Sequence, residues 1–339
     1  MKFKLIFVVL TASLIICSNA SKACDYCIVG QGISPLEHTE GKSLSFRLNS
    51  RYTALKTFFA GNDKIDDLEG EEETHFTTEI TGSYRLSNRF TVLAILPLPR
   101  RSVSIDEDAE HLQDEQSDDG HEHDHDAAPV SDGNLIHTHG ASGSSFDFGD
   151  LSILGRLNLV KNQNTAVALQ TGFKVPTGGT SALDDVGGLL DAHIQPGTGS
   201  WDFRVGGAFN HAKDRWGISS NVLYSINTTG ETGDDDYRYG NWLNSDITAR
   251  YQILSSAMNQ TGLSLALGVN GEFRGREKLN DREIENTGGE VLYFSPGLQL
   301  EISALTIEAS VLYPFYHRLN GEAQLGEDLK SYLSINYGL

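Results

Sequence analysis

The sequence predicts an all-β protein, a transmembrane antiparallel up-and-down β-barrel of about 12 strands. Three observations lead to this fold class. Apolar and polar residues alternate from about Lys42 to the C-terminus. The alternating segments are about ten residues or longer, which is the length that a tilted strand needs to cross a bilayer. The connections between the segments are alternately short and long, which is typical of outer-membrane barrels.

The N-terminus has the pattern of an export signal. Lys2 and Lys4 precede an apolar run, and small residues follow that run up to Ala23. We therefore expect residues 1–23 to be a signal peptide, residues 24–41 to form a periplasmic N-terminal segment, and residues 42–339 to form the barrel. No later segment is an unbroken apolar run of the length that a membrane helix needs.

The alternation gives each predicted strand two different faces, because successive side chains of a strand point to opposite sides. In residues 216–227 and 263–274, nearly every second residue is apolar and the residues between are polar, small or charged. A soluble β-sandwich with one wet face is the alternative, but its strands are usually shorter. The predicted strands are 43–58, 74–86, 89–99, 148–160, 164–175, 201–212, 215–228, 241–253, 262–275, 290–301, 304–316 and 328–339.

The connections predict which end of the barrel faces which compartment. The short links are 86–89, 160–163, 213–215, 302–304 and the somewhat longer 254–262, and we place them in the periplasm. The long outer links are 60–73, 100–147, 176–200, 229–240, 275–289 and 318–328. The glycine-rich residues 178–199 are expected to form a flexible outer loop. Folding of this loop into the barrel mouth is a second arrangement that the sequence allows.

The two faces carry different side chains. We expect the aromatic residues near strand ends to lie on the lipid face, as interface girdles do. These are Tyr52, Tyr84, Phe90, Trp201, Phe209, Trp216, Tyr251, Phe273, Tyr313, Phe315 and Tyr337. The charged residues of the polar face are expected to line the lumen, because a soluble core could not bury so many charges without extensive pairing. These are Arg47, Arg51, Arg85, Arg156, Arg204, Arg250, Arg274, Glu79, Asp202, Asp246 and Glu272.

Three stretches of the barrel resemble a known family. They are "GDLSILGRLNLV" (residues 149–160), "TGFKVPTGG" (171–179) and "IQPGTGSWDFRVGGAF" (194–209). They resemble an uncharacterised family of Gram-negative outer-membrane β-barrels, described as transporter-like or as phenol-degradation-pathway proteins. The resemblance covers most of the mature chain and implies a barrel in the cell outer membrane that passes or binds small molecules.

The link 100–147 is acidic and rich in histidine, and we expect it to be disordered. Imidazole and carboxylate ligands together suit Zn, Cu or Ni. The candidate metal ligands there are His121, His123, His125, His137 and His139. The alternative is a charged, solvated surface brush in which the histidines are incidental.

Cys24 and Cys27 form a CxxC pair in the segment before the barrel. They are candidates for a thiolate metal clip, a redox pair or a local disulfide. The sequence contains no Gly-x-Ser-x-Gly motif and no convincing Ser/His/Asp arrangement. We therefore expect that the protein is not an enzyme.

The charge pattern leads to an expected function. A formal net charge of -20 makes nucleic acid a poor partner. Opposed arginine and carboxylate rows in a narrow lumen favour passive passage or binding of a small polar solute, with metal cations concentrated by the outer histidine link. The alternative is a non-transporting surface protein that anchors a metal-scavenging or adhesive loop. The partners expected in either case are outer-membrane lipid and a small polar solute or a metal cation.

Overall fold

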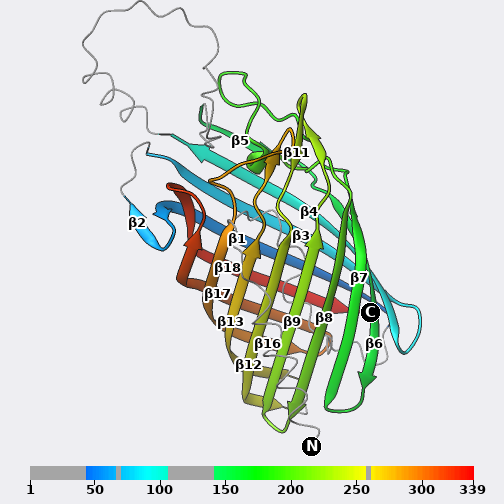
Figure 1. The fold of residues 1–339 in the computed structure, drawn as a ribbon. Helices are drawn as coiled ribbons and strands as arrows, with labels where there is room; N and C mark the ends of the chain where they lie inside the picture. The colour runs from blue at the N-terminus through cyan, green and yellow to red at the C-terminus, as the bar shows by residue number, and fades with distance from the viewer. Residues whose placement is uncertain (1–42, 66–69, 106–140, 257–260) are drawn as a thin grey trace, which may run out of the picture.

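The computed structural model describes residues 43–65, 70–105, 141–256 and 261–339. It confirms the predicted fold: a sheet of 14 strands contains the 12 long antiparallel strands of a closed barrel (Figure 1), in which β18 pairs with β1. Among these residues, no helix is long and apolar enough to cross a membrane. The long strands are β1 (Leu44–Ala60), β3 (Glu72–Arg85), β4 (Phe90–Ser104), β6 (Leu151–Lys161), β7 (Thr165–Val175), β8 (Asp202–Lys213), β9 (Trp216–Ile226), β12 (Trp242–Ser256), β13 (Thr261–Arg274), β16 (Gly289–Ile302), β17 (Leu305–Leu319) and β18 (Gln324–Gly338).

Strand β1 shows how the alternation is used. Phe46 and Leu48 are exposed by 47% and 41%, whereas Arg47 and Asn49 beside them are exposed by 8% and 5%. A water-soluble protein has the opposite arrangement, with apolar residues inside. The outer surface of the barrel is therefore apolar and suited to lipid, and its interior is polar.

Two predicted links differ from the structure. The link 318–328 was predicted to be long, and this is wrong: β17 ends at Leu319 and β18 begins at Gln324. The predicted link 100–147 is shorter at both ends, because β4 runs to Ser104 and pairs there with the short strand β5 (Gly143–Phe146). In both places the chain continues as strand beyond the apolar alternation that marked the membrane-spanning part.

The ladder between β17 and β18 covers only part of the hairpin. Its recorded pairs run from Leu305 with Tyr337 to Leu312 with Lys330. At the long-loop end, where the two strands separate, a buried apolar cluster fills the interior. It consists of Phe59, Val291, Tyr293, Leu312 and Leu319. Apolar packing thus contributes to the stability of this region, beyond the end of the recorded ladder.

The long-loop end carries a second, smaller sheet. Its strands are β10 (Gly230–Thr232), β11 (Asp235–Arg238), β14 (Lys278–Leu279) and β15 (Arg282–Glu283), and they come from two different links. The short strand β2 (Asp63–Ile65) pairs antiparallel with the last residues of β1 at the same end. The small sheet packs against the 3-10 turn η2 (Ala192–Ile194) through a core of Ala192, Tyr237, Tyr239 and Ile284.

Residues 176–201, which we name the plug loop, fold over the interior at this end. Arg101 of β4 donates hydrogen bonds to the carbonyl oxygens of His193 and Gln195, at 2.7 and 3.0 Å. The loop also folds closely on itself: a Cβ on Gly197 would lie 2.3 Å from the carbonyl carbon and oxygen of Gly178. Only glycine permits this approach. Of the two arrangements left open for residues 178–199, the structure thus has the loop folded into the barrel mouth.

Candidate functional site

The structure brings the predicted lumen residues together on the inner side of the barrel. Eight of them are buried, and they are Arg47, Arg51, Arg156, Arg204, Arg274, Glu79, Asp202 and Glu272. The other three, Arg85, Arg250 and Asp246, are half-buried. These residues do not form one site but separate groups at different levels of the interior.

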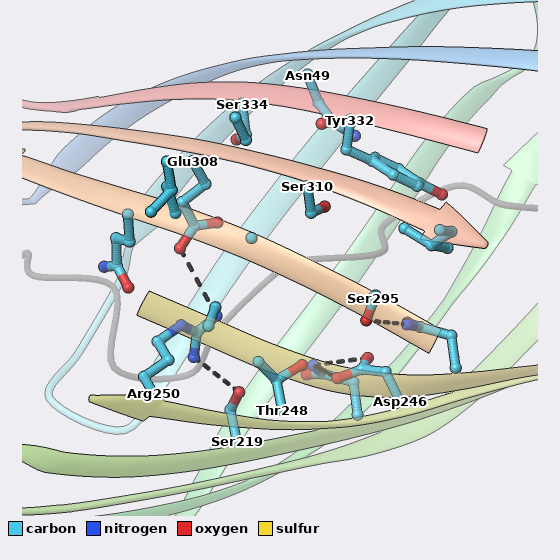
Figure 2. Close-up of a pocket in the computed structure, with 18 residues that line it drawn as sticks. Asn49, Ser219, Asp246, Thr248, Arg250, Ser295, Glu308, Ser310, Tyr332 and Ser334 are labelled. Carbon is cyan, nitrogen blue, oxygen red and sulfur yellow. Dashed lines mark hydrogen bonds and ion pairs between the residues drawn. The ribbon is translucent and has the colours of Figure 1, made fainter. Parts of the chain in front are cut away.

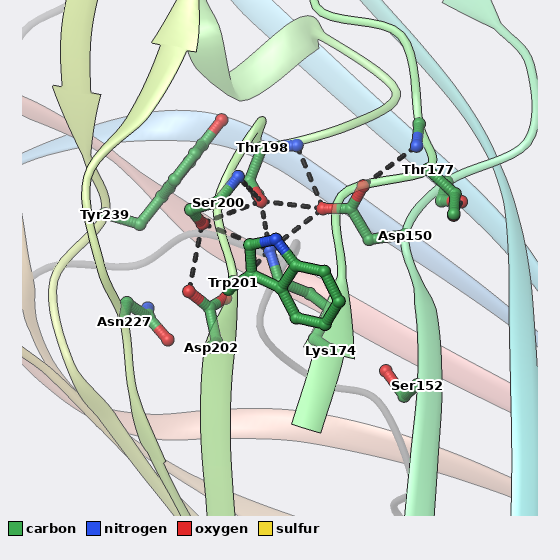
Figure 3. A network of polar contacts seen from close by, with 12 residues as sticks. Asp150, Ser152, Lys174, Thr177, Thr198, Ser200, Trp201, Asp202, Asn227 and Tyr239 are labelled. Atoms are coloured by element: carbon green, nitrogen blue, oxygen red, sulfur yellow. Dashed lines mark hydrogen bonds and ion pairs between the residues drawn. The ribbon is translucent and has the colours of Figure 1, made fainter.

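The first group lies where the plug loop meets the ends of strands β6, β7 and β8 (Figure 3). The Lys174 ammonium of β7 lies 2.8 Å from a carboxylate oxygen of Asp150 and 2.8 Å from one of Asp202. Thr198 and Ser200 of the plug loop donate to the same carboxylates: the Thr198 hydroxyl lies 2.6 Å from Asp150, and the Ser200 hydroxyl 2.9 Å from Asp202. The hydrogen bonds of Thr198 and Ser200 therefore fasten the plug loop to the ion-paired carboxylates before β6 and at the start of β8.

Asp150 lies just before β6 and is ionised in this network. Burial by itself would raise the pKa of its carboxyl. The charge and hydrogen bond of Lys174, together with the Thr198 hydroxyl and the Gly178 backbone N–H, outweigh burial and hold that pKa below its usual value. The carboxylate of Asp150 thus acts as a fixed anchor for the plug loop.

A second group of buried charged side chains lies on strands β13 and β18. Lys330 of β18 reaches Glu272 of β13 at 2.7 Å and Glu327 of its own strand at 3.2 Å. Arg274 contacts both of these carboxylates. Strands β16 and β17 lie between β13 and β18 in the sheet, so these side chains cross the interior. With side chains exposed by 4% or less, the four residues fill this part of the lumen with paired charges.

Between the mouth and the middle of the barrel the interior is narrow. A cavity of only about 10 Å³ remains, lined in part by Arg51, Glu79, Arg101, Lys174 and Arg204. We name this the constriction. Its volume is about the minimum that one water molecule needs, and its charged lining comes from both the barrel wall and the mouth network.

Below the constriction a polar cavity opens, which we name the chamber (Figure 2). Its volume is about 110 Å³. Asn49 connects the two levels, since it lines the chamber and donates to Glu79 of the constriction at 3.4 Å. In the chamber, Asp246 accepts from Asn221 at 3.0 Å. Leu298, Leu312 and Tyr332 give part of the lining an apolar character.

The chamber meets a wider cavity at the short-turn end, which we name the vestibule. The vestibule has a volume of about 310 Å³, and Arg250, Glu308, Gln299 and Ser334 line both cavities. Arg250 and Glu308 stand 3.7 Å apart, with side chains exposed by 23% and 27%, and Arg250 also donates to the Ser219 hydroxyl at 2.8 Å. Figure 2 shows this pair at the end of the chamber. The ion pair is therefore long and partly solvated, unlike those at the mouth.

Sequence reasoning missed several charged residues of these groups, namely Asp150, Lys174, Glu308, Glu327 and Lys330. Four of them lie within predicted strands, in phase with the polar face, so the same alternation could have found them. Glu327 lies in the segment that was predicted as a link. The alternation gives no indication of which of these charges pair.

The candidate metal ligands His121, His123, His125, His137, His139, Cys24 and Cys27 lie outside the described residues. Within the part of the chain that the structure describes, no group of three or more His, Cys, Asp or Glu side chains is arranged to hold a metal ion. Zn, Cu or Ni binding thus stays a prediction about the undescribed link and N-terminal segment.

A protein-family model described as "Putative MetA-pathway of phenol degradation" matches residues 58–319. No curated protein matches the chain. The structure is similar to that of an outer membrane channel from Pseudomonas putida F1, with a TM-score of 0.61, 14% sequence identity, and 88% of this chain and 96% of that chain covered. At this identity the likeness establishes the fold alone.

Two weaker likenesses have TM-scores too low to support any argument. One is to the transport unit of the autotransporter AIDA-I from Escherichia coli, with a TM-score of 0.48, 8% identity, and 94% of this chain and 95% of that chain covered. The other is to the toluene transporter of Pseudomonas putida, with a TM-score of 0.40, 9% identity, and 88% and 90% covered.

Proposed function

The chain belongs to the family described as "Putative MetA-pathway of phenol degradation", and on this premise we propose that it is an outer-membrane channel that binds and passes a small polar solute. The solute occupies the chamber and leaves through the vestibule. In the resting state the plug loop and the constriction close the other end, so passage requires the plug loop to move.

The observation that supports this proposal is the pair of polar cavities in series. The chamber and the vestibule share Arg250 and Glu308, and most of the chamber lining consists of hydroxyl, amide and charged groups. Such a lining satisfies the hydrogen-bonding groups of a polar solute inside a barrel whose outer surface is apolar. A barrel that serves only as an anchor does not need a cavity of this kind.

Filling the chamber tests the proposal. Thr248 lines the chamber, whereas its neighbour Ile247 is on the outer face and exposed by 39%. We expect Thr248→Trp to reduce solute uptake into liposomes carrying the protein, and Ile247→Trp to leave it unchanged. A small sugar such as arabinose and the amino acid glycine serve as probes. Equal uptake by both variants, or none by the unmodified protein, would reject the channel.

A hydroxylated aromatic solute is a second candidate. The family description refers to phenol degradation, and the chamber places Leu312 and Tyr332 on one part of its lining and Arg250 and Glu308 on another. A phenol-sized ring would pack against the first pair while its hydroxyl bonds to the second. We expect phenol to compete with arabinose for uptake, and Tyr332→Ala to weaken this competition; uptake of arabinose that phenol does not reduce would exclude this candidate.

We also propose a separate role for the histidine-rich link, residues 100–147. If residues 106–139 capture Zn, Cu or Ni, deleting them abolishes metal binding by the purified protein while solute uptake persists. If the barrel only anchors this link as a scavenger or adhesin, the unmodified protein shows no uptake at all. Metal titration of the two proteins beside the uptake assay separates these outcomes.

A further inference from the structure

The lining of the chamber contains one carboxylate, that of Asp246, without an ion-pair partner among the described residues. We propose that this carboxylate binds the ammonium group of a small protonated amine, and that the solute of the channel is such an amine. The inference rests on the proposed channel function and adds the chemical class of the solute. Binding of the amine and its passage can be measured separately, so either one can fail alone.

The first observation is how the charges of the chamber are paired. Its charged side chains are those of Asp246, Arg250 and Glu308. The guanidinium of Arg250 contacts Glu308 and Ser219 (Figure 2). No Lys, Arg or His nitrogen of the described residues lies within 4.0 Å of the Asp246 carboxylate. Arg250 therefore attracts Asp246 only from a longer distance, and the carboxylate is free to pair with a cationic solute.

The vestibule brings no surplus of positive charge to the chamber. Its lining carries equal numbers of guanidinium groups and carboxylates, namely Arg47, Arg215, Arg250, Asp214, Glu301 and Glu308. Asp246 of the chamber adds one more carboxylate to this set. The two cavities together are thus lined by three guanidinium groups and four carboxylates, a balance that favours a cation over an anion.

The second observation is the hydrogen bonding around Asp246. In the sheet, Asp246 of β12 stands opposite Asn221 of β9 and Asn270 of β13. Asn221 donates its amide group to the two carboxylate oxygens, at 3.0 and 3.3 Å. Asn270 instead donates to the Ser295 hydroxyl at 2.7 Å. Because a carboxylate has about four acceptor sites, one amide leaves most of them available.

Asn221 is the third observation, because its carbonyl oxygen is also without a donor. This Oδ1 atom is buried and has no hydrogen-bond partner among the described residues. Asp246 and Asn221 thus present acceptors only, and buried acceptors without donors are costly. An ammonium group has three donors and no acceptor. A metal ion fits less well, because hard cations take six or more oxygen ligands and the described residues hold no cluster of three such side chains.

The test compares two amines of equal charge. Ethanolamine is protonated at neutral pH, whereas choline carries its charge on a nitrogen without N–H groups; arabinose is the neutral reference. We expect liposomes carrying the full chain to take up ethanolamine faster than choline or arabinose, after subtraction of uptake by protein-free liposomes. Asp246→Asn keeps the size of the side chain and removes its charge. It should lower the ratio of ethanolamine to arabinose uptake about tenfold.

Binding is measured separately, by calorimetric titration of the detergent-solubilised full chain with ethanolamine. We expect saturable binding that Asp246→Asn abolishes. Asp63→Asn makes the same change at an exposed position of β2 and should alter neither binding nor uptake. Asp246→Glu keeps the charge and should retain the preference for ethanolamine over choline. The heat-dependent mobility of barrels in gels reports whether each variant is folded, and Asp246→Glu serves as the test variant if Asp246→Asn is not.

The outcomes separate the amine site from the channel. If no probe enters the liposomes but ethanolamine binds and Asp246→Asn abolishes the binding, the channel function is rejected and the amine site stands. Uptake of arabinose without saturable binding of ethanolamine rejects the amine site and leaves the channel. Equal uptake of choline and ethanolamine, or a preference for ethanolamine that persists in Asp246→Asn, also rejects the amine site.

Discussion

The two ends of the interior use ion pairs in opposite ways. At the mouth, the Lys174 ammonium lies 2.8 Å from both Asp150 and Asp202, and its side chain is exposed by 2%. In the chamber, Arg250 and Glu308 are 3.7 Å apart and exposed by 23% and 27%. A desolvated charge with several partners is costly to disturb, whereas a solvated pair separates easily. The ion pairs at the mouth are therefore expected to stay intact, whereas the Arg250 and Glu308 pair is expected to separate readily.

The largest effect is expected when Lys174 is replaced by Met. This change leaves the carboxylates of Asp150 and Asp202 buried near each other without their shared cation. Breaking a buried ion pair in this way costs about 3–5 kcal/mol. We expect a loss of this size in the free energy of unfolding, measured by urea titration of the lipid-reconstituted barrel, and a higher conductance because the plug loop loosens.

Lys56 supplies the control for that experiment. It forms a short ion pair with Glu72, but both side chains are about half exposed, at 49% and 47%. Lys56→Met should change stability and conductance little, because water replaces the lost partner. If the two lysine variants behaved alike, burial would not be what distinguishes the mouth from the rest of the barrel.

A smaller loss is expected from Gly197→Ala in the plug loop. The new Cβ would lie 2.3 Å from the backbone of Gly178, so one of the two segments must move. Overpacking of this kind usually costs about 1–3 kcal/mol. Hydrogen exchange of the plug loop should become faster. Gly179→Ala is the control, since nothing lies within 4 Å of its added Cβ; equally fast exchange in both variants would contradict the close packing.

The same comparison shows how far sequence reasoning reaches. The alternation predicted the twelve strands and placed Arg47, Arg250 and Asp202 on the polar face, because strand geometry fixes which side chains share a face. It could not predict that Lys330 pairs with Glu272, since that contact crosses two intervening strands and depends on the shape of the closed barrel. Nor could it predict that the plug loop supplies Thr198 to Asp150, because loop conformation has no comparable period.

Acid should weaken the mouth through Asp150. Its pKa in the folded protein is held below the ordinary value of about 3.9. The ionised carboxylate thus stabilises the fold fully above that ordinary value, and this contribution is lost as the pH falls through the lower folded-state pKa. Unfolding measured from pH 6 down to pH 3 should show a steeper loss below about pH 4 in the unmodified protein than in Asp150→Asn. If the stability of the two proteins fell in parallel as the pH is lowered, Asp150 would not anchor the plug loop as an anion.

The smallest effect on stability is expected for the partly solvated pair of Arg250 and Glu308. Arg250→Gln and Glu308→Gln should each lower the free energy of unfolding by less than about 1 kcal/mol, and the double variant should show little coupling between them. Solute uptake should nevertheless change, because both side chains line the chamber and the vestibule. A coupling of several kcal/mol in the double-mutant cycle would mean that this pair is a structural clamp like Lys174 and its partners. In that case the contrast between the two ends of the interior would disappear.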